Sequence, residues 1–286
     1  MTSKSPAKSN VPSALYVVAT PIGNLKDMTY RAVETLKSVA VVACEDTRTS
    51  HVLLQHYGIE TPTLSFHEHN SASMQDTLIT RLAAGESIAL LSDAGTPLVS
   101  DPGESLVKAV WETGHRVIPI PGASATMTAL SAAGVATDGF YFAGFLPTKA
   151  SEREARLAFL RALPVTIIMF EAPHRILETL EHLLASLGNR TAVIARELTK
   201  TYETFHRGTL ASLAETMKEK TPKGEMVLLV EPAVSEGALQ DSAMIDTLLK
   251  DALTRLPKSA AAAEVAKATG LTRQEIYARA IALSTQ

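Results

Sequence analysis

Short, uninterrupted runs of apolar residues alternate with amphipathic stretches along the N-terminal half of the chain. Each run is rich in β-branched residues, which is typical of a short buried strand, and the amphipathic stretches have the spacing of helices. Strands that alternate with helices in this way predict a parallel, doubly wound sheet. The predicted strands cover residues 14–19, 39–44, 87–91 and 116–120, and the predicted helices cover 29–38, 74–84, 104–113 and the stretch from PGASAT to about Ala132.

The pattern changes after AGVATD (residues 133–138), which marks a candidate domain boundary. The last three predicted strands follow one another with one helix among them, and this order favours a mixed or antiparallel sheet. The expected fold class is therefore α/β, with a parallel-rich N-terminal sheet and a mixed C-terminal sheet. The predicted strands of this second part are 141–146, 165–170, 191–197, 201–207 and 225–231, and the predicted helices are 152–162 and 174–187.

Residues 232–237 have the composition of a linker, and the pattern beyond them predicts three short helices at 243–253, 258–269 and 272–283. Gly270 stands where a C′ glycine ends a helix, and Thr272 can cap the next one. This turn matches a helix-turn-helix, and a simple three-helix bundle is the alternative. The predicted organisation is a flexible N-terminal tail (1–13), an N-terminal α/β domain (14–134), a C-terminal α/β domain (138–232) and a helical, helix-turn-helix-like tail (240–286).

Composition narrows the class of protein. The 286 residues are 46% apolar and 20% charged, and no apolar stretch is long enough to span a bilayer. The polar N-terminus predicts no secretory signal, and the single Cys44 excludes an internal disulfide, argues against structural zinc and fits a reducing cytoplasm. The net charge of −3 gives no general reason to expect nucleic acid, but residues 250–286 carry six basic and three acidic side chains, a local charge of +3.

Two turns that follow predicted strands carry the candidate ligand chemistry. ATPIGNL (residues 19–25) and SDAGTPLVSDPG (residues 92–103) present backbone amides and small hydroxyls at the carboxyl edge of the predicted sheet, where ligands of open α/β sheets bind. The chain contains neither G-x-G-x-x-G nor G-x-x-x-x-G-K-[ST], so a Rossmann dinucleotide site or a P-loop is not expected. A small zwitterionic ligand with an adenosine suits these turns better.

A series of motifs, in order along the chain, resembles one family, the tetrapyrrole-methylase-like (class III) methyltransferases. Within it, the chain resembles the bacterial branch that methylates the ribose 2′-oxygen of a cytidine in small-subunit (16S) ribosomal RNA, including the helix-turn-helix tail of that branch. Tetrapyrrole methylases usually carry G-x-G-x-G and G-D-P turns, and TPIGNL and DAGTP stand here instead, which favours the RNA branch. The motifs are ATPIGNL (19–25), ACEDTR (43–48), SDAGTPLVSDPG (92–103), PGASATMTALSAAG (121–134), FLP (145–147), FEAPHR (170–175), ARELTKTYE (195–203) and KGEMVLLVE (223–231).

The resemblance implies a homodimeric, cytoplasmic enzyme that binds S-adenosylmethionine (SAM) between its two α/β domains and acts on the assembled small ribosomal subunit. The turn that begins at Ser92 would hold the methionine end, a helix start would offer N–H groups to its carboxylate, and second-domain residues would contact the adenosine. The alternative for each small residue is a tight turn or close helix packing. The implied cofactor residues are Thr20, Pro21, Ile22, Ser92, Asp93, Ala94, Gly95, Thr96, Pro97, Ser124, Ala125, Ala172, Ala195 and Met226.

ACEDTR is the candidate catalytic motif. Glu45 or Asp46 could accept the proton of a ribose hydroxyl or orient the ribose, and Arg48 could hold a neighbouring phosphate. A surface salt bridge between Asp46 and Arg48 is the alternative. The pair of histidines in His67-Glu68-His69 could share one face of a strand, but no third ligand is evident, and no metal is predicted.

The expected RNA contacts are basic or polar side chains near the cleft and in the tail. Two rival functions use the same motifs: a small-molecule methylase of the tetrapyrrole type, and a non-catalytic RNA-binding factor in ribosome assembly that keeps the SAM fold. The predicted RNA-contacting residues are His67, Arg175, Lys200, Lys223, Lys258 and Arg273.

Overall fold

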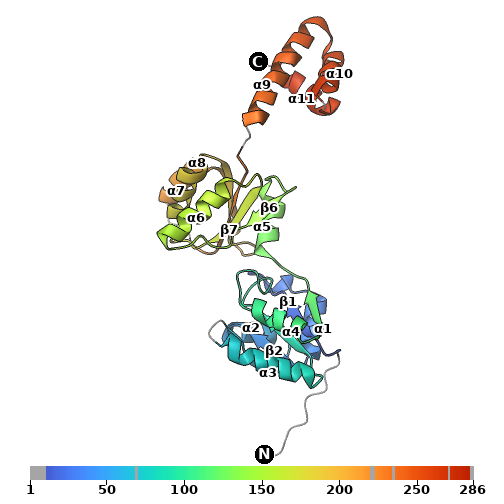
Figure 1. The fold of residues 1–286 in the computed structure, drawn as a ribbon, viewed down its shortest axis with the longest axis vertical. Coiled ribbons are helices and arrows are strands. Elements are labelled where there is room, and N and C mark those ends of the chain that lie inside the picture. The colour runs from blue at the N-terminus through green and yellow to red at the C-terminus, as the bar shows by residue number, and fades with distance from the viewer. Residues whose placement is uncertain (1–10, 68–69, 220–222, 234–235, 270, 284–286) are drawn as a thin grey trace, which may run out of the picture. The chain divides into compact units, whose positions relative to one another are not determined.

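The computed structural model describes residues 11–67, 70–219, 223–233, 236–269 and 271–283 (Figure 1). The chain divides into two compact units, Met1–Pro232 and Ala233–Gln286. Residues 1–10 of the predicted flexible tail, Glu68, His69 and Gly270 lie outside the described residues. No helix within those described ranges has both the length and the apolar character needed to cross a membrane.

The first sheet of Met1–Pro232 has the strand order β3-β2-β4-β1-β5, and every neighbouring pair is parallel. This confirms the predicted parallel sheet. The edge strand β3 was not predicted, because two of its three residues are exposed and its sequence, TLS, has no apolar run. Parallel strands end at one edge, so the loops after them converge there. The strands are β1 (Leu15–Val18), β2 (Val41–Cys44), β3 (Thr63–Ser65), β4 (Ile88–Leu91) and β5 (Val117–Ile120).

Helices cover both faces of this sheet. Tyr16 packs in a cluster with buried residues of α1 and α2, whereas its neighbour Leu15 packs in a second cluster with buried residues of α3 and α4. Alternate residues of a strand point to opposite faces, so strands covered on both sides are apolar throughout, as the sequence pattern indicates. The helices are η1 (Leu25–Asp27), α1 (Tyr30–Ser38), α2 (Thr47–His56), α3 (Ser71–Ala83) and α4 (Glu104–Glu112).

The second sheet of the same unit has the order β6-β7-β10-β8-β9. Only the β6–β7 pair is parallel, and the other pairs are antiparallel, which confirms the predicted mixed sheet. Strand β10 begins where β7 and β8 end, because Met226 pairs with both Glu171 and Arg196. The strands are β6 (Phe140–Phe142), β7 (Thr166–Glu171), β8 (Thr191–Arg196), β9 (Thr204–Thr209) and β10 (Met226–Val230).

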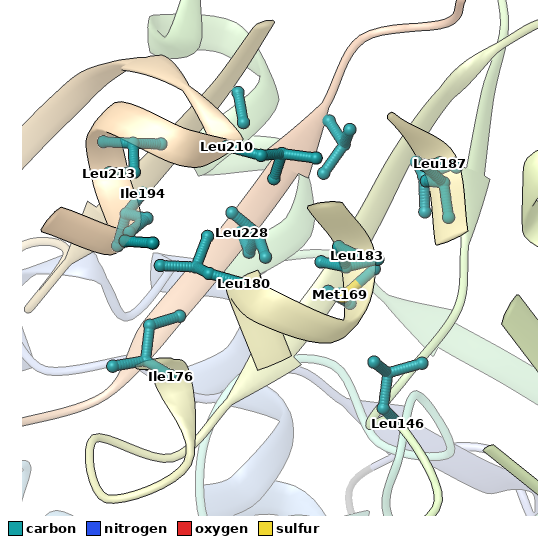
Figure 2. Packing of buried hydrophobic residues seen from close by; sticks show 14 of the residues in the cluster. Leu146, Met169, Ile176, Leu180, Leu183, Leu187, Ile194, Leu210, Leu213 and Leu228 are labelled. Carbon is teal, nitrogen blue, oxygen red and sulfur yellow. The ribbon is translucent and has the colours of Figure 1, made fainter. Parts of the chain in front are cut away.

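One face of the second sheet packs against three helices in the core drawn in Figure 2. Leu180 and Leu183 of α7 are fully buried there with Met169 and Leu228 of the strands. The opposite face is covered by α5, whose buried small residues cluster with residues of β8 and β10. The helix that the sequence analysis placed in the domain 14–134 therefore packs on the second sheet. The helices are α5 (Ala125–Ala133), α6 (Ala150–Arg161), α7 (Ile176–Leu187) and α8 (Leu210–Glu219).

The unit Ala233–Gln286 contains the three predicted helices, α9 (Glu236–Arg255), α10 (Lys258–Thr269) and α11 (Arg273–Leu283). Their buried side chains form one small core. The predicted cap at Thr272 is present as a capping box, in which Glu275 Oε2 accepts from Thr272 N (3.0 Å) and Glu275 N donates to Thr272 Oγ1 (3.3 Å).

Candidate functional site

A cavity of about 350 Å³ lies in the unit Met1–Pro232. Its walls come from the turn after β4, the start of α5 and the edge of the second sheet where β7 and β8 end and β10 begins. These walls bring together residues from several motifs that are far apart in the sequence. The predicted cofactor residues that line the cavity are Ile22, Ala94, Gly95, Thr96, Ser124, Ala125, Ala172, Ala195 and Met226.

The remaining predicted cofactor residues belong to the turns behind this lining. Thr20 N donates to Gly95 O (2.8 Å) and Gly95 N donates to Thr20 O (3.1 Å), so the two predicted turns are joined directly. The hydroxyl of Thr20 also contacts Ser92 O at 3.3 Å. Gly95 has a φ of +80°, a conformation that glycine adopts without strain. Thr20 and Ser92 thus fix the shape of the cavity wall, while Pro21 and Pro97 are buried and Asp93 is exposed at the turn.

The N-terminus of α5 forms the next part of the wall. Ser124 is its N-cap and accepts from Met127 N at 3.5 Å, and Thr96 Oγ1 donates to Ala123 O (3.2 Å), which ties the turn after β4 to this helix start. The hydroxyl of Thr126 is buried and has no hydrogen-bond partner among the described residues, and Thr126 lines the cavity. A helix N-terminus with an unsatisfied hydroxyl beside it suits an anionic or polar ligand group, such as a carboxylate.

The second sheet supplies an apolar wall. Ala195 is fully buried, Met226 is 3% exposed, and Phe170 and Val227 line the cavity beside them. Glu171 also lines the cavity, and its buried carboxylate accepts from Ala172 N (2.8 Å) and from the Thr179 hydroxyl (2.6 Å). An apolar wall with few polar groups is typical of a site for a flat, largely apolar ligand part.

Three carboxylates from the loops after β2 and β4 lie near one another. Asp101 lines the cavity, and its pKa is raised to about 6 by burial and by the nearby charge of Glu45. Burial and the charge of Asp93 likewise raise the pKa of Glu45. Asp93 Oδ1 accepts from Asp46 N at 3.1 Å. We call Glu45, Asp93 and Asp101 the acidic cluster.

Asp101 is a site residue that the sequence analysis missed. It follows Ser100 in the second half of SDAGTPLVSDPG, and both Leu98 (φ +73°) and Ser100 (φ +70°) have left-handed backbone. Strained backbone of this kind is concentrated at functional sites. The repeated Ser-Asp of the motif was the signal that could have identified it.

Asp46 and Arg48 adopt the alternative arrangement, a surface ion pair. Asp46 is the N-cap of α2, and its Oδ1 accepts from Arg48 N at 2.8 Å. The Arg48 Nη2 to Asp46 Oδ2 distance is 2.8 Å, with the arginine side chain 91% exposed. Hydrogen bonds from the arginine lower the pKa of Asp46 to about 2, so this carboxylate is a poor proton acceptor at neutral pH.

The predicted RNA-contacting residues are divided between the two units. His67 lies near Glu45, whose pKa is nevertheless raised by burial and by the charge of Asp93. Arg175 points back into its own domain and donates to Leu146 O at 2.7 Å. Lys200 Nζ contacts Glu197 and Glu225, each at 3.0 Å, and Lys223 is exposed. In the unit Ala233–Gln286, Lys258 and Arg273 are exposed, and Arg273 donates to Ser259 Oγ at 2.7 Å.

The cavity fits SAM in chemical terms. The amides of Ala94 and Thr96 and the start of α5 are placed to bind a carboxylate, and the apolar wall can enclose an adenosine. No group of three or more His, Cys, Asp or Glu that could hold a metal ion occurs in the described part of the chain.

Comparisons with known proteins agree with this arrangement. The family described as Tetrapyrrole (Corrin/Porphyrin) Methylases matches residues 14–214, and the family described as RsmI C-terminal HTH domain matches residues 240–284. The chain is similar to Ribosomal RNA small subunit methyltransferase I of Mesorhizobium japonicum, with 51% identity over 94% of this chain and 92% of that protein.

Two solved structures show the fold. Diphthine synthase has a TM-score of 0.60 and 18% identity and covers 78% of this chain and 92% of its own. Uroporphyrin-III C-methyltransferase from Thermus thermophilus, complexed with S-adenosyl homocysteine, has a TM-score of 0.54 and 19% identity and covers 76% of this chain and 96% of its own.

Proposed function

The chain belongs to the tetrapyrrole methylase family of methyltransferases, and we propose that it transfers a methyl group from SAM to the ribose 2′-oxygen of a cytidine in 16S ribosomal RNA. The substrate is the assembled small ribosomal subunit, and the enzyme is a cytoplasmic homodimer. The observation that carries the proposal is the relationship to ribosomal RNA small subunit methyltransferase I, which extends over 94% of the chain.

The C-terminal unit favours RNA over a tetrapyrrole as the substrate. The match to the tetrapyrrole methylase family covers residues 14–214, and residues 240–284 match a separate helix-turn-helix domain. Helix-turn-helix units are a recurrent nucleic-acid-binding element, so their addition to a methylase fold supports a nucleic-acid substrate.

The cavity supports the proposed position of SAM. Backbone amides of Ala94 and Thr96 and the start of α5 hold the methionine end, and the Thr126 hydroxyl gains the partner that it otherwise lacks. Ala172, Ala195 and Met226 enclose the adenosine. SAM, when bound, supplies an electrophilic methyl group on its sulfonium.

The acidic cluster supplies the base in the proposed reaction. The ribose hydroxyl must lose its proton as its oxygen attacks, and a carboxylate within hydrogen-bond reach accepts that proton. Asp101 and Glu45 have raised pKa values, which makes them better proton acceptors than ordinary carboxylates. Asp46 keeps its structural role as a helix cap, and Arg48 is exposed beside the cluster, where it can contact a phosphate.

Methyl incorporation tests the proposal directly. The protein is incubated with labelled SAM and, in separate reactions, with small subunits from cells that lack this methylation, free 16S RNA, large subunits and uroporphyrinogen. Label is expected in small subunits, and nuclease digestion should release 2′-O-methylcytidine. Label in the tetrapyrrole would favour the small-molecule rival, and SAM binding by calorimetry without label in any substrate would favour a non-catalytic assembly factor. Light scattering during gel filtration measures the molar mass and so tests whether the enzyme is a dimer.

A further inference from the structure

Phe145 is an exposed aromatic residue at the proposed site. Its side chain lines the cavity although the residue is 51% exposed. The ring packs edge-to-face on Phe170, with ring centroids 5.7 Å apart and an angle of 65° between the planes. Phe170 itself packs on Phe142 at 4.9 Å. Phe145 is therefore the outer member of a row of three rings, and it is the one that is exposed to solvent.

The backbone around Phe145 is held in place on both sides. Gly144, with a φ of +65°, accepts from Phe170 N at 3.0 Å. Leu146 is 2% exposed, and its carbonyl accepts from Arg175 Nη2 at 2.7 Å. The same guanidinium lies 3.5 Å from the buried Glu171 carboxylate. Because both neighbours are anchored, the ring is presented in one place rather than on a loose loop.

Phe145 also shares the lining of the cavity with Asp101 of the acidic cluster. A Cβ atom added to Gly144 would be 3.7 Å from the Ser100 hydroxyl, so the turn that carries Phe145 lies near the loop that carries Asp101. Phe145, Ser100 and Asp101 all line the cavity. A ribose placed at Asp101 would thus have an exposed aromatic ring within reach of its base.

We propose that Phe145 is the stacking surface for the base of the target nucleotide, an inference that rests on the proposed function. Aromatic side chains bind unstacked bases through their faces, and single-stranded RNA is commonly recognised in this way. The nucleotide leaves its stack, its base packs on Phe145, and its ribose lies at the acidic cluster. Phe145 thereby positions the 2′-oxygen without taking part in proton transfer.

The test compares F145A, F145L and F145W in the full-length protein, with small subunits as substrate. Loss of one base–aromatic contact should lower kcat/KM by about 5- to 150-fold in F145A. F145L keeps apolar volume without an aromatic face and should remain impaired, whereas F145W should recover most of the wild-type value. SAM affinity, measured by calorimetry, should stay within about threefold of wild type in all three, since the lost contact is with RNA.

Phe159 provides the matched control. It is another surface aromatic residue, 49% exposed, which packs on Tyr141 at 5.4 Å and does not line the cavity. F159A should methylate subunits at the wild-type rate.

Three results would overturn the inference. They are an F145A enzyme with wild-type kcat/KM, an F145L enzyme as active as F145W, and a large loss of SAM affinity in F145A, which would place the ring against the cofactor instead. If the wild-type protein methylates no small subunit, the proposed function fails and this inference fails with it. An active wild type with an equally active F145A overturns the inference alone.

Discussion

The two sheets of the unit Met1–Pro232 contribute different chemistry to one cavity. The first sheet is parallel, and the loops at its carboxyl edge supply backbone amides, hydroxyls and the acidic cluster. The second sheet is mixed, and it supplies mainly apolar side chains such as Ala195 and Met226. Parallel strands bring every carboxyl end to one edge, whereas in the mixed sheet the end of β7, the end of β8 and the start of β10 meet because of their register.

This difference predicts unequal tolerance to substitution. Polar groups of the first sheet must lie at fixed positions to hold a carboxylate or accept a proton, so small changes there should be costly. The apolar wall acts mainly through shape and exclusion of water, so substitutions that keep its volume should be tolerated.

The largest expected effect is on the acidic cluster. Glu45→Gln and Asp101→Asn remove a proton acceptor without changing shape, and at least one should lower the methyl-transfer rate by about 10²- to 10⁴-fold. SAM affinity should be retained, because the turn at Gly95 and the start of α5 are unchanged. Asp46→Asn is the control, since asparagine also caps helices well, and its rate should stay near wild type. The sequence-based assignment of Asp46 as a catalytic residue gains support if instead Asp46→Asn is the inactive variant.

The pH dependence provides an independent measurement on Asp101. A carboxyl group with a pKa of about 6 is protonated below that pH, so the wild-type rate should fall as the pH drops through 6. The folded protein also bears a cost for keeping Asp101 charged above pH 6. Asp101→Asn should therefore raise the free energy of unfolding at neutral pH by about 1–2 kcal/mol after solvent screening.

This stabilisation should shrink as the pH falls from about 6 to about 4. In that range the wild-type Asp101 binds its proton in the folded state but not yet in the unfolded state, where the ordinary pKa is 3.8. Denaturant unfolding of both proteins across the pH range measures the difference. A constant difference at all pH values would mean that the charge of Asp101 is not its source.

The next largest effect is expected at the turn after β4. Gly95→Val forces a side chain onto a backbone with φ +80°, and its Cβ would lie 3.3 Å from Ile22 Cγ2. The backbone strain and the side chain added at the cavity wall should weaken SAM binding by about 10- to 100-fold. Gly114→Val is the matched control, because Gly114 has a φ of +76° and no atom within 4 Å of the added Cβ. It should lose stability but bind SAM normally, and equal loss of binding in both variants would refute the special role of Gly95.

The buried strands and the turns of the cavity wall could be predicted from the sequence. Other parts of the site depend on contacts between distant segments and could not. Unbroken apolar runs identified the buried strands, and the glycine-containing turns identified the cavity wall. Asp101 was missed because its proximity to Glu45 depends on β2 and β4 being neighbours in the sheet, which the order of elements does not reveal. Arg175 was predicted to contact RNA, but only the folded chain brings the Leu146 carbonyl to it. Helix α2 begins with the polar residues TRTSH, so it was not recognised after ACEDTR.

A smaller effect is expected in the unit Ala233–Gln286, where exposed lysines would bind the RNA through their charge. Lys258 and Lys267 are exposed and form no ion pair with a described residue. If they contact phosphates, Lys258→Gln with Lys267→Gln should raise the KM for subunits by about 3- to 10-fold at low salt. The slope of log affinity against log salt should become shallower by about 1.4–1.8.

The control for this pair is the same change of charge in the other unit. Lys37→Gln with Lys108→Gln alters two exposed lysines of α1 and α4 and should leave both the KM and the salt slope unchanged. SAM affinity should be unaffected in both double variants. If the two double variants behave alike, the tail acts through net charge or serves only as a structural bundle, the alternative that the sequence left open.

The smallest effect is expected at the apolar wall. Met226→Leu keeps the volume and apolar character of a residue that is 3% exposed, so SAM affinity should change by less than about threefold and stability by less than about 1.5 kcal/mol. Met217→Leu is the control, because Met217 is 6% exposed in the same core cluster and does not line the cavity. Calorimetry with SAM and denaturant unfolding measure both quantities. A tenfold loss of affinity in Met226→Leu alone would mean that the second sheet recognises the adenosine through a specific sulfur contact, and the contrast between a demanding first sheet and a tolerant second sheet would be wrong.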